Sequence, residues 1–186
     1  MERKVILIIN GYPGAGKDTF ADVVVTSLAN LGWQARSISS IDPIRAMLRK
    51  EGIPVDKKGP EERKLMSDVK AAFNAYDRHA DRMAAQAALD FVQRPGDRAI
   101  FVHVREPESI DFMETLVPEP IWFTSVFVER NFDCAALSNE SDKGVEAYSY
   151  DFRAINNDTK EKFEQAAEAF AQTLNAMDLT VEVADG

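Results

Sequence analysis

The hydrophobic pattern begins with a short apolar run and continues with helical stripes. Residues 5–9 are all aliphatic, which is typical of a strand buried on both faces of a parallel sheet. Apolar residues then recur at helical spacing from Phe20 to Leu31, and Gly32 is placed to end this helix. The sequence "WQARSIS" (33–39) predicts a second strand. The chain thus opens in the order strand, loop, helix, strand.

A helical region follows. Residues 41–52 predict a short helix with Asp42 as its cap and Pro43 at the first helical position. After a polar linker, residues 60–93 show helical periodicity and predict two helices with a break within 74–80. The buried stripes expected on these helices are Leu65, Val69, Phe73 and Tyr76 on the first and Ala84, Ala87, Ala88 and Phe91 on the second.

The second half of the chain alternates again between strands and helices. Pro107 is placed to begin one helix, and Asp158, with Glu161 three residues later, indicates the cap of the last one. The polar residues 131–146 lack periodicity and predict a loop or cover. The predicted strands are 99–104, 121–129, 147–157 and an edge strand at 179–183. The stripe expected on the last helix is Phe163, Ala167, Phe170 and Leu174.

Strands that alternate with helices predict an α/β fold, in which helices cover both faces of a mainly parallel sheet of about five strands. Ligands of such sheets bind outside the carboxyl ends of the strands. The 186 residues are enough for one domain with a substantial core, and neither a repeat nor a linker divides them. We therefore expect a single domain over residues 1–186.

Composition and charge narrow the range of partners. The net charge of −9 argues against a nucleic-acid partner, since such binding relies on many Lys and Arg, whereas a small anion needs only a favourable local potential. No apolar run approaches the roughly 20 residues of a membrane span, and no signal segment precedes residues 5–9, so we expect no membrane partner and a cytoplasmic protein. The single cysteine, Cys134, is compatible with a reducing compartment. The oligomeric state stays open, a homodimer included.

The sequence "GYPGAGKDTF" (11–20) carries the most specific chemistry. Gly11, Gly16 and Lys17 fill the first seven positions of the phosphate-binding pattern G-x-x-x-x-G-K-[ST] between a predicted strand and helix. Glycines permit the positive φ angles that let backbone N–H groups surround a phosphate, and Lys17 would neutralise its charge. A glycine-rich turn with a surface lysine is the alternative. The residues expected to hold ATP are Gly11, Tyr12, Pro13, Gly14, Ala15, Gly16, Lys17, Asp18 and Thr19.

Asp18 stands where this pattern has a magnesium-binding Ser or Thr. A carboxylate is a hard-oxygen ligand that can take over from the missing hydroxyl, directly or through water, and Thr19 remains available to donate to a phosphate. We therefore predict that Mg²⁺ binds at Asp18 and Thr19. The alternative for Asp18 is an acid that is favoured at a helix N-terminus by the macrodipole.

These motifs resemble those of small nucleotide kinases. The frame G-x-P-G-x-G-K-x-T at residues 11–19 resembles adenylate kinases, and "GKDT-x-AD" resembles the deoxynucleoside monophosphate kinases of bacteriophages. The segments "DPIR" (42–45), "HVREPE" (103–108) and "DFRAINN" (151–157) are similar to further segments of the phage family. The resemblance implies a P-loop kinase fold with a helical acceptor-binding region at about 53–95 and a short lid at about 131–146. Phosphomevalonate kinases of the P-loop type share "GKD" and a strand-end arginine.

His103 departs from this resemblance, because the phage family has an aspartate at that position. A neutral imidazole is a poor ligand for Mg²⁺, so we interpret His103 as a strand residue that makes a structural hydrogen bond. The departure leaves open a degenerate kinase that binds a nucleotide without turning it over.

A kinase that acts on a small phosphate needs cations around the acceptor. Arg105 follows a predicted strand at its carboxyl end, and the resemblance implies that it grips the acceptor phosphate; ion pairs with Glu106 or Glu108 are the alternative. The resemblance also points to Arg45 as a substrate-binding residue, for which a surface residue is the alternative. Asp42 could bind the acceptor as well as cap its helix, and the cap is the preferred interpretation.

Three further arginines are candidates for phosphate binding. Arg78 and Arg82 are one turn apart and could form a fork for the acceptor phosphate, or pair with Asp77 and Asp81 instead. Arg130 opens the loop at 131–146 and could reach ATP phosphates. The residues expected to act in catalysis are Lys17, Arg105 and Arg130.

The function expected from these residues is transfer of the γ-phosphoryl group of ATP to a nucleoside monophosphate, with a deoxynucleotide favoured. The alternatives are a P-loop kinase for another small metabolite, such as phosphomevalonate, and a nucleotide-binding regulatory NTPase. Against the latter, the sequence contains no guanine-reading "NKxD" segment.

Overall fold

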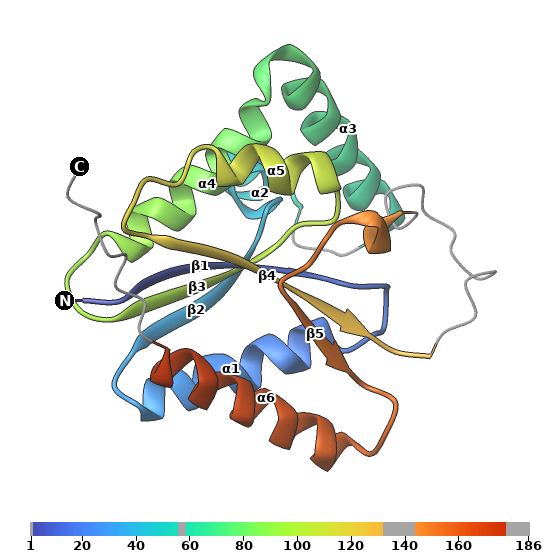
Figure 1. The fold of residues 1–186 in the computed structure, drawn as a ribbon. Coiled ribbons are helices and arrows are strands. Elements are labelled where there is room, and N and C mark those ends of the chain that lie inside the picture. Colours follow the sequence, from blue (N-terminus) through green and yellow to red (C-terminus); the bar gives the residue numbers. More distant parts are fainter. Residues whose placement is uncertain (1, 56–58, 132–143, 178–186) are drawn as a thin grey trace.

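The computed structural model describes residues 2–55, 59–131 and 144–177 (Figure 1). Five parallel strands form one sheet in the order β2-β3-β1-β4-β5. The strands are β1 (Lys4–Asn10), β2 (Gln34–Ser39), β3 (Arg98–His103), β4 (Trp122–Glu129) and β5 (Phe152–Ile155). The predicted parallel sheet of about five strands is confirmed, whereas the predicted edge strand at 179–183 and most of the loop at 131–146 lie outside the described residues.

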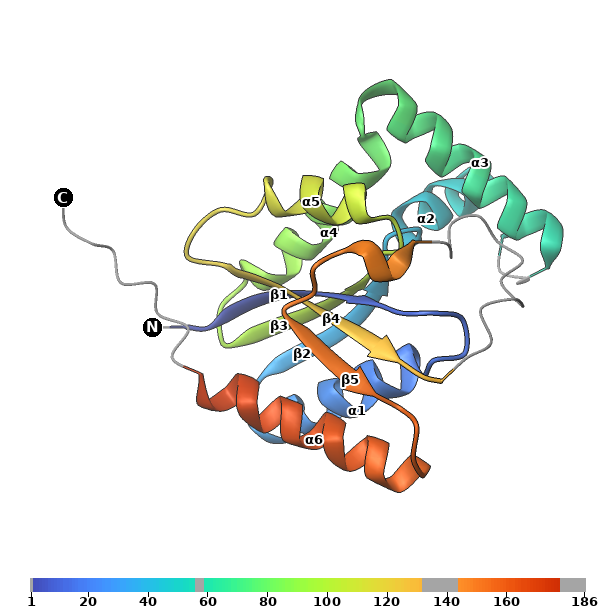
Figure 2. The same ribbon diagram turned by 45° about the vertical axis from the view of Figure 1, so that its right-hand side comes forward.

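Helices cover both faces of this sheet (Figures 1 and 2). One face packs against the first and last helices, and the other face packs against the fourth and fifth. The helices are α1 (Lys17–Asn30), α2 (Asp42–Lys50), α3 (Pro60–Asp77), α4 (His79–Val92), α5 (Pro107–Glu114) and α6 (Lys160–Ala176), with a short 3₁₀ helix η3 at Val145–Ala147. This is the predicted three-layer α/β/α arrangement.

The apolar run at residues 5–9 explains why both faces are covered. Successive residues of a strand point to opposite faces of the sheet, and all five side chains are fully buried. Both faces next to β1 are therefore covered. Val5, Leu7 and Ile9 pack in the cluster with α1 and α6, whereas Ile6 and Ile8 pack in the cluster with α4 and α5. β1 therefore lies at the centre of the core, and the loop that follows it is anchored to the most buried strand.

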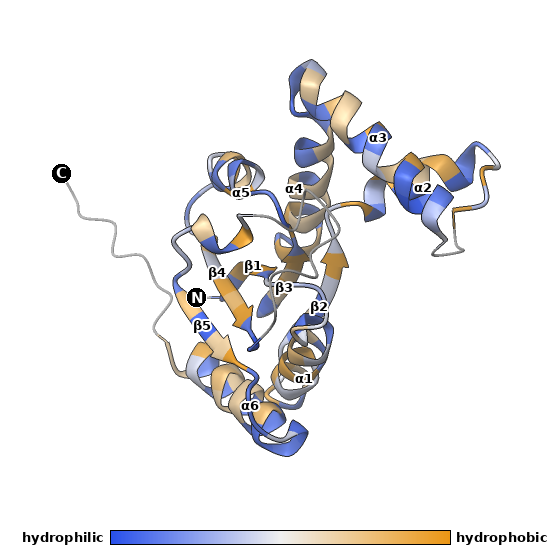
Figure 3. Ribbon diagram, turned by 90° about the vertical axis from the view of Figure 1, so that its right-hand side faces the viewer, coloured by the Kyte–Doolittle hydropathy of each residue, from blue (hydrophilic) through white to orange (hydrophobic). Residues whose placement is uncertain are grey.

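A smaller apolar cluster joins α2, α3 and the start of α4. Its buried members are Ile44, Leu48, Val55, Met66 and Ala80. Figure 3 shows α2 and α3 extending away from the sheet, so this part of the chain forms a helical unit beside the strands. The two predicted helices and the break at 74–80 are confirmed, because α3 ends at Asp77 and α4 begins at His79.

Some details of these helices differ from the sequence predictions. Tyr76 and Leu65 were expected in the buried stripe of α3, but Tyr76 is 87% exposed and Leu65 is 36% exposed. The reason is that α3 packs mainly on α2 and α4, so Met66 is its single buried residue. Val69 and Phe73 are partly buried there, as predicted.

The two predicted caps are each displaced by one residue. α2 begins at Asp42 itself, whose carboxylate Oδ2 accepts from the backbone N–H of Ser39 at 2.7 Å instead of capping the helix. α6 is capped by Thr159, whose hydroxyl accepts from the Lys162 N–H, while the Asp158 carboxylate accepts from the Thr159 N–H at 2.9 Å. At α6 two neighbouring polar residues compete for the cap, whereas the N-cap position of α2 falls on Ile41, which makes no side-chain cap bond.

Among the described residues, no helix has the length and apolar character needed to cross a membrane.

Candidate active site

The loop between β1 and α1, residues 11–16, has the backbone conformation that its glycines predict. Gly11, Gly14 and Gly16 have φ angles of 147°, 76° and 103°. Gly16 precedes α1 without a side-chain cap, so the first N–H groups of that helix are open towards an anion. The Lys17 ammonium donates to the carbonyl oxygens of Gly11 at 2.6 Å and Tyr12 at 2.8 Å. The lysine is therefore held over the loop, where a phosphate would bind.

Residues from distant strands hold this loop in place. The side-chain amide of Asn156, just after β5, donates to the carbonyl of Ala15 at 2.8 Å. Arg130, at the end of β4, lies with Nη1 at 3.5 Å from the Gly14 carbonyl, so the structure brings this predicted arginine to the loop. The sequence contained Asn156 within "DFRAINN" but nothing that assigned it to the loop.

Asp18 and His103 lie opposite one another at the mouth of the site. The Asp18 side chain is 93% exposed, and its Oδ1 lies 3.7 Å from His103 Nδ1. His103 Nε2 lies 2.9 Å from the hydroxyl of Ser37 on β2, which is the structural hydrogen bond expected for this residue. Burial lowers the pKa of His103, more than the nearby Asp18 carboxylate raises it, so the imidazole is neutral at pH 7.

The strand ends next to the loop carry the predicted acceptor residues. Arg105 is exposed just after β3, the neighbour of β1 in the sheet, and its carbonyl accepts from the Asn10 side chain at 3.0 Å. Arg45 forms an ion pair with Asp42 at the start of α2, after β2. Ser40 donates its N–H to the His103 carbonyl at 3.0 Å, which holds the ends of β2 and β3 together. The candidates Arg105, Asp42 and Arg45 therefore share one edge of the sheet.

Arg78 and Arg82 meet on the ring of Phe112 of α5, at 5.0 and 5.3 Å from its centre. Arg78 is the N-cap of α4 in a left-handed conformation (φ 61°), and its carbonyl accepts from the Arg82 N–H at 3.0 Å, so the two arginines lie one turn apart. Arg78 pairs with the buried Asp81 at 3.0 Å and also donates to the Glu108 carbonyl. Arg82 donates to the main-chain oxygen of Asp77 at 3.0 Å. The structure thus shows both arginines in contact with neighbouring residues at the α3–α4 junction.

The sequence did not indicate an ion pair between the helical unit and the acceptor edge. Lys70 of α3 lies 2.6 Å from a carboxylate oxygen of Glu106, the residue after Arg105. Both side chains are largely buried. Burial acts to raise the pKa of the Glu106 carboxyl, but the charge and hydrogen bond of Lys70, together with a backbone hydrogen bond and the Arg105 charge, hold that pKa below its ordinary value of 4.5. This pair ties α3 to the segment that carries Arg105.

We predict that Lys70→Met lowers the free energy of unfolding by about 1–2 kcal/mol at pH 7, between the values for exposed and buried pairs. A carboxyl with a lowered pKa stabilises the fold above its unfolded pKa, and this stability is lost as the pH falls through the folded value. The difference between the variant and the wild type should therefore shrink at pH 3. Urea denaturation at pH 7 and pH 3 measures this difference in the free energy of unfolding. The control is Lys64→Met, because Lys64 is exposed and pairs with Asp68. An equal difference at both pH values would contradict the prediction.

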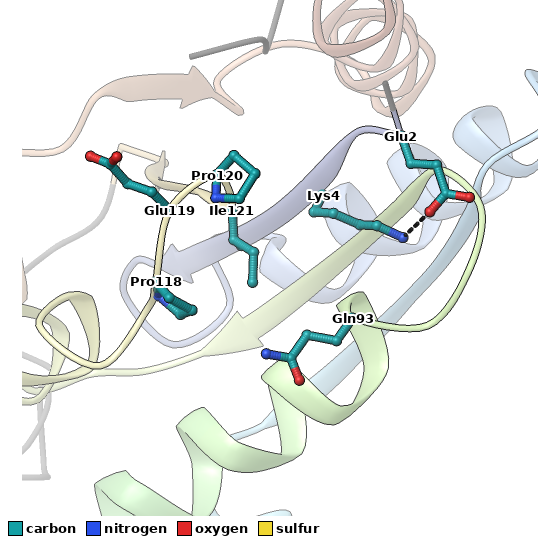
Figure 4. Close-up of a pocket in the computed structure, with 7 residues that line it drawn as sticks. All are labelled: Glu2, Lys4, Gln93, Pro118, Glu119, Pro120 and Ile121. Atoms are coloured by element: carbon teal, nitrogen blue, oxygen red, sulfur yellow. Dashed lines mark ion pairs between the residues drawn. The ribbon is translucent and has the colours of Figure 1, made fainter. Parts of the chain in front are cut away.

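A cavity of about 410 Å³ lies far from this site, near the amino ends of the strands (Figure 4). Glu2 and Lys4 line one side of it, and residues 118–121 line another. The Lys4 ammonium is engaged by Glu2 at 2.9 Å and by the Gly96 carbonyl at 2.7 Å. The cavity therefore offers no open cation for a phosphate and plays no part in the chemistry expected at the loop.

Comparisons with known proteins agree with this architecture. No family model and no curated protein sequence matches the chain. Among solved structures, it is similar to the APS kinase of Mycobacterium tuberculosis in complex with AMPPNP and APS, with 15% identity over 95% of this chain and 100% of that chain and a TM-score of 0.57. It is also similar to the dephospho-CoA kinase of Campylobacter jejuni, with 15% identity over 91% of this chain and 96% of that chain and a TM-score of 0.54. The chain has the fold of the P-loop kinases.

Proposed function

We propose that this protein transfers the γ-phosphoryl group of ATP to a nucleoside monophosphate, with a deoxynucleotide as the favoured acceptor. The observation that carries the proposal is the placement of two cations in the segments that follow two neighbouring strands, β1 and β3. Lys17 lies over the loop that follows β1, and Arg105 follows β3, which pairs with β1 from Lys4 to Ile9. A donor phosphate at the loop and an acceptor phosphate at Arg105 would therefore meet at one edge of the sheet.

The proposed mechanism relies on positioning and charge, without a covalent enzyme intermediate. Lys17 and the loop N–H groups hold the donor phosphates, and Arg130 approaches the same loop near Gly14. Arg105 grips the acceptor phosphate and aligns its oxygen for in-line attack. Asp42, Arg45, Arg78 and Arg82 complete the proposed acceptor side. The assignment of residues 1–186 to one kinase domain, with acceptor binding at about 53–95, belongs to the same proposal.

The residues at the loop are suited to Mg²⁺ bound together with ATP. No group of three or more His, Cys, Asp or Glu side chains that could hold a metal occurs in the part of the chain that the structure describes. Mg²⁺ commonly uses one or two protein oxygens together with substrate phosphates and water, and the exposed Asp18 carboxylate and the Thr19 hydroxyl could supply them. When bound, the ion neutralises charge that develops on the phosphates.

We predict that Asp18→Asn raises the Mg²⁺ concentration needed for half-maximal activity by about tenfold, because an amide oxygen carries no net charge. Titration of ADP release with Mg²⁺, and calorimetry of ATP binding with and without Mg²⁺, measure the effect. Asp22→Asn, in the next turn of α1, is the control. An unchanged Mg²⁺ requirement would make Asp18 an acid that only favours the helix N-terminus.

Measurement of ADP release across a panel of acceptors tests the function. Production of ADP that depends on a nucleoside monophosphate supports the proposal. Dependence on phosphomevalonate or another metabolite would move the protein to a different acceptor class, and release without any acceptor would favour a regulatory NTPase. A cytoplasmic location and the oligomeric state, a homodimer included, stay predictions from the sequence.

A further inference from the structure

Asn10 is a fully buried polar residue at the carboxyl end of β1, immediately before the phosphate loop. Its side chain makes three hydrogen bonds. Oδ1 accepts from the backbone N–H of Gly11 at 2.8 Å. Nδ2 donates to the Arg105 carbonyl at 3.0 Å and to the Tyr150 hydroxyl at 2.7 Å. One amide thus contacts the donor loop, the main chain of the acceptor arginine and a segment about 140 residues away.

The hydrogen bond to the Tyr150 hydroxyl links Asn10 to the segment at residues 145–150. The Tyr150 hydroxyl donates to the Val145 carbonyl at 2.6 Å. Burial raises the pKa of Tyr150 to about 12, so the hydroxyl is a donor at neutral pH. In parallel, the Tyr12 hydroxyl of the loop donates to the Glu146 carboxylate at 2.6 Å. The loop is therefore attached to this segment at two points, through Asn10 and through Tyr12.

An amide side chain is the group that this position requires. Its NH₂ supplies two donors and its oxygen an acceptor, and all three are used in directions set by three different elements. A carboxylate would lack both donors, and an apolar side chain would leave the Gly11 N–H and the Arg105 carbonyl without this partner. The three hydrogen bonds of the Asn10 side chain go to two backbone groups and the Tyr150 hydroxyl, so through them Asn10 acts on the reaction by way of the backbone that it holds.

We propose that Asn10 is a positioning residue. With Tyr150 as its partner, it fixes the positions of the donor loop, the Arg105 main chain and the segment at residues 145–150 relative to one another. The inference rests on the proposed function for its kinetic consequence and on the hydrogen bonds above for its structural one. The distance between donor and acceptor phosphates depends on the relative position of the loop and Arg105. A misplacement of about 1 Å can cost about 10²-fold in rate.

The test compares Asn10→Ala, Tyr150→Phe and the double variant with the wild type. Tyr150→Phe removes one hydroxyl and keeps the ring, and Tyr148→Phe is its matched control, because the Tyr148 hydroxyl makes no hydrogen bond with the described residues.

We expect Asn10→Ala to lower kcat/KM for the acceptor by about 10²-fold and to weaken ATP binding. Tyr150→Phe removes two hydrogen bonds, from Asn10 and to the Val145 carbonyl, and should raise the acceptor KM by about tenfold, whereas Tyr148→Phe should leave it unchanged. The double variant should be worse than Asn10→Ala by less than the Tyr150→Phe factor, because the two side chains share one hydrogen bond and Tyr150→Phe also removes the bond to Val145.

A merely structural role predicts other results. Asn10→Ala would then lower Tm and the active fraction, while the ATP Kd and the acceptor KM of the folded protein stay at wild-type values, and that outcome overturns the proposal. Equal effects of Tyr150→Phe and Tyr148→Phe on the acceptor KM also overturn the proposal. This comparison of the two tyrosine variants can be made even if Asn10→Ala fails to fold. If the wild type binds ATP but phosphorylates no acceptor, the proposed function fails, whereas calorimetric ATP affinities of the same variants still decide the role of Asn10.

Discussion

Lys17→Ala is expected to lower acceptor-dependent ADP release by about 10³-fold or more while the protein stays folded. The lysine is the cation held over the phosphate loop, where its ammonium donates to the Gly11 and Tyr12 carbonyls. A bound triphosphate would compete for the same ammonium, so the side chain is poised to exchange two carbonyl partners for phosphate oxygens. Without it, the loop retains its backbone donors but loses the charge that stabilises the transferring phosphoryl group.

Steady-state ADP release and calorimetric ATP affinity measure this effect, and circular dichroism and Tm test the fold. Lys160→Ala is a suitable control, because that lysine is exposed at the start of α6 and pairs only loosely with Glu164 at 3.5 Å. We expect the Lys17 variant to keep a Tm close to that of the wild type, since the lysine is partly exposed and Asn156 still holds the loop backbone. Full activity in Lys17→Ala would overturn the assignment of the phosphate loop, and with it the proposed function.

The parts of the fold that the sequence predicts are those decided by local patterns. The aliphatic run at residues 5–9 predicts a doubly buried strand because every side chain in it is apolar, and the structure buries all five. The phosphate loop is predictable for the same reason, since its glycines and its lysine lie within seven residues. The predicted burial of Leu65 and Tyr76 on α3 is wrong, because periodicity indicates which side of a helix is apolar but not how much of that side packs against other elements.

The contacts that shape the site are long-range, and no local pattern contains them. Asn156 holds the Ala15 carbonyl from 141 positions away, and Lys70 pairs with Glu106 across 36. Each of these depends on the order of the strands in the sheet and on the packing of α3, neither of which follows from periodicity. For His103, the sequence predicts the role but not the partner. Its location in a strand indicates a structural hydrogen bond, whereas the partner Ser37 is identified only by the pairing of β2 with β3.

Gly11→Ala is expected to lower the free energy of unfolding by about 3–5 kcal/mol and to weaken ATP binding, because a side chain at this position has no room. The φ angle of Gly11 is 147°, and a Cβ placed there would lie 2.2 Å from the Val128 carbonyl oxygen. That oxygen belongs to β4, which pairs with β1 in the centre of the sheet and is fully buried at Val128. The clash cannot be relieved by rotating a side chain, so either the loop or the strand must move.

Gly32→Ala separates this clash from ordinary backbone strain. Gly32 also has a positive φ angle, 90°, but nothing lies within 4 Å of a Cβ placed there, so that variant should lose only about 1–2 kcal/mol. Urea denaturation of both variants and calorimetry with ATP provide the comparison. We expect Gly32→Ala to keep the wild-type ATP affinity, because Gly32 follows α1 at the end remote from the loop. Equal losses of stability in the two variants, together with unchanged ATP binding in Gly11→Ala, would show that β4 does not hold the first residue of the phosphate loop in place.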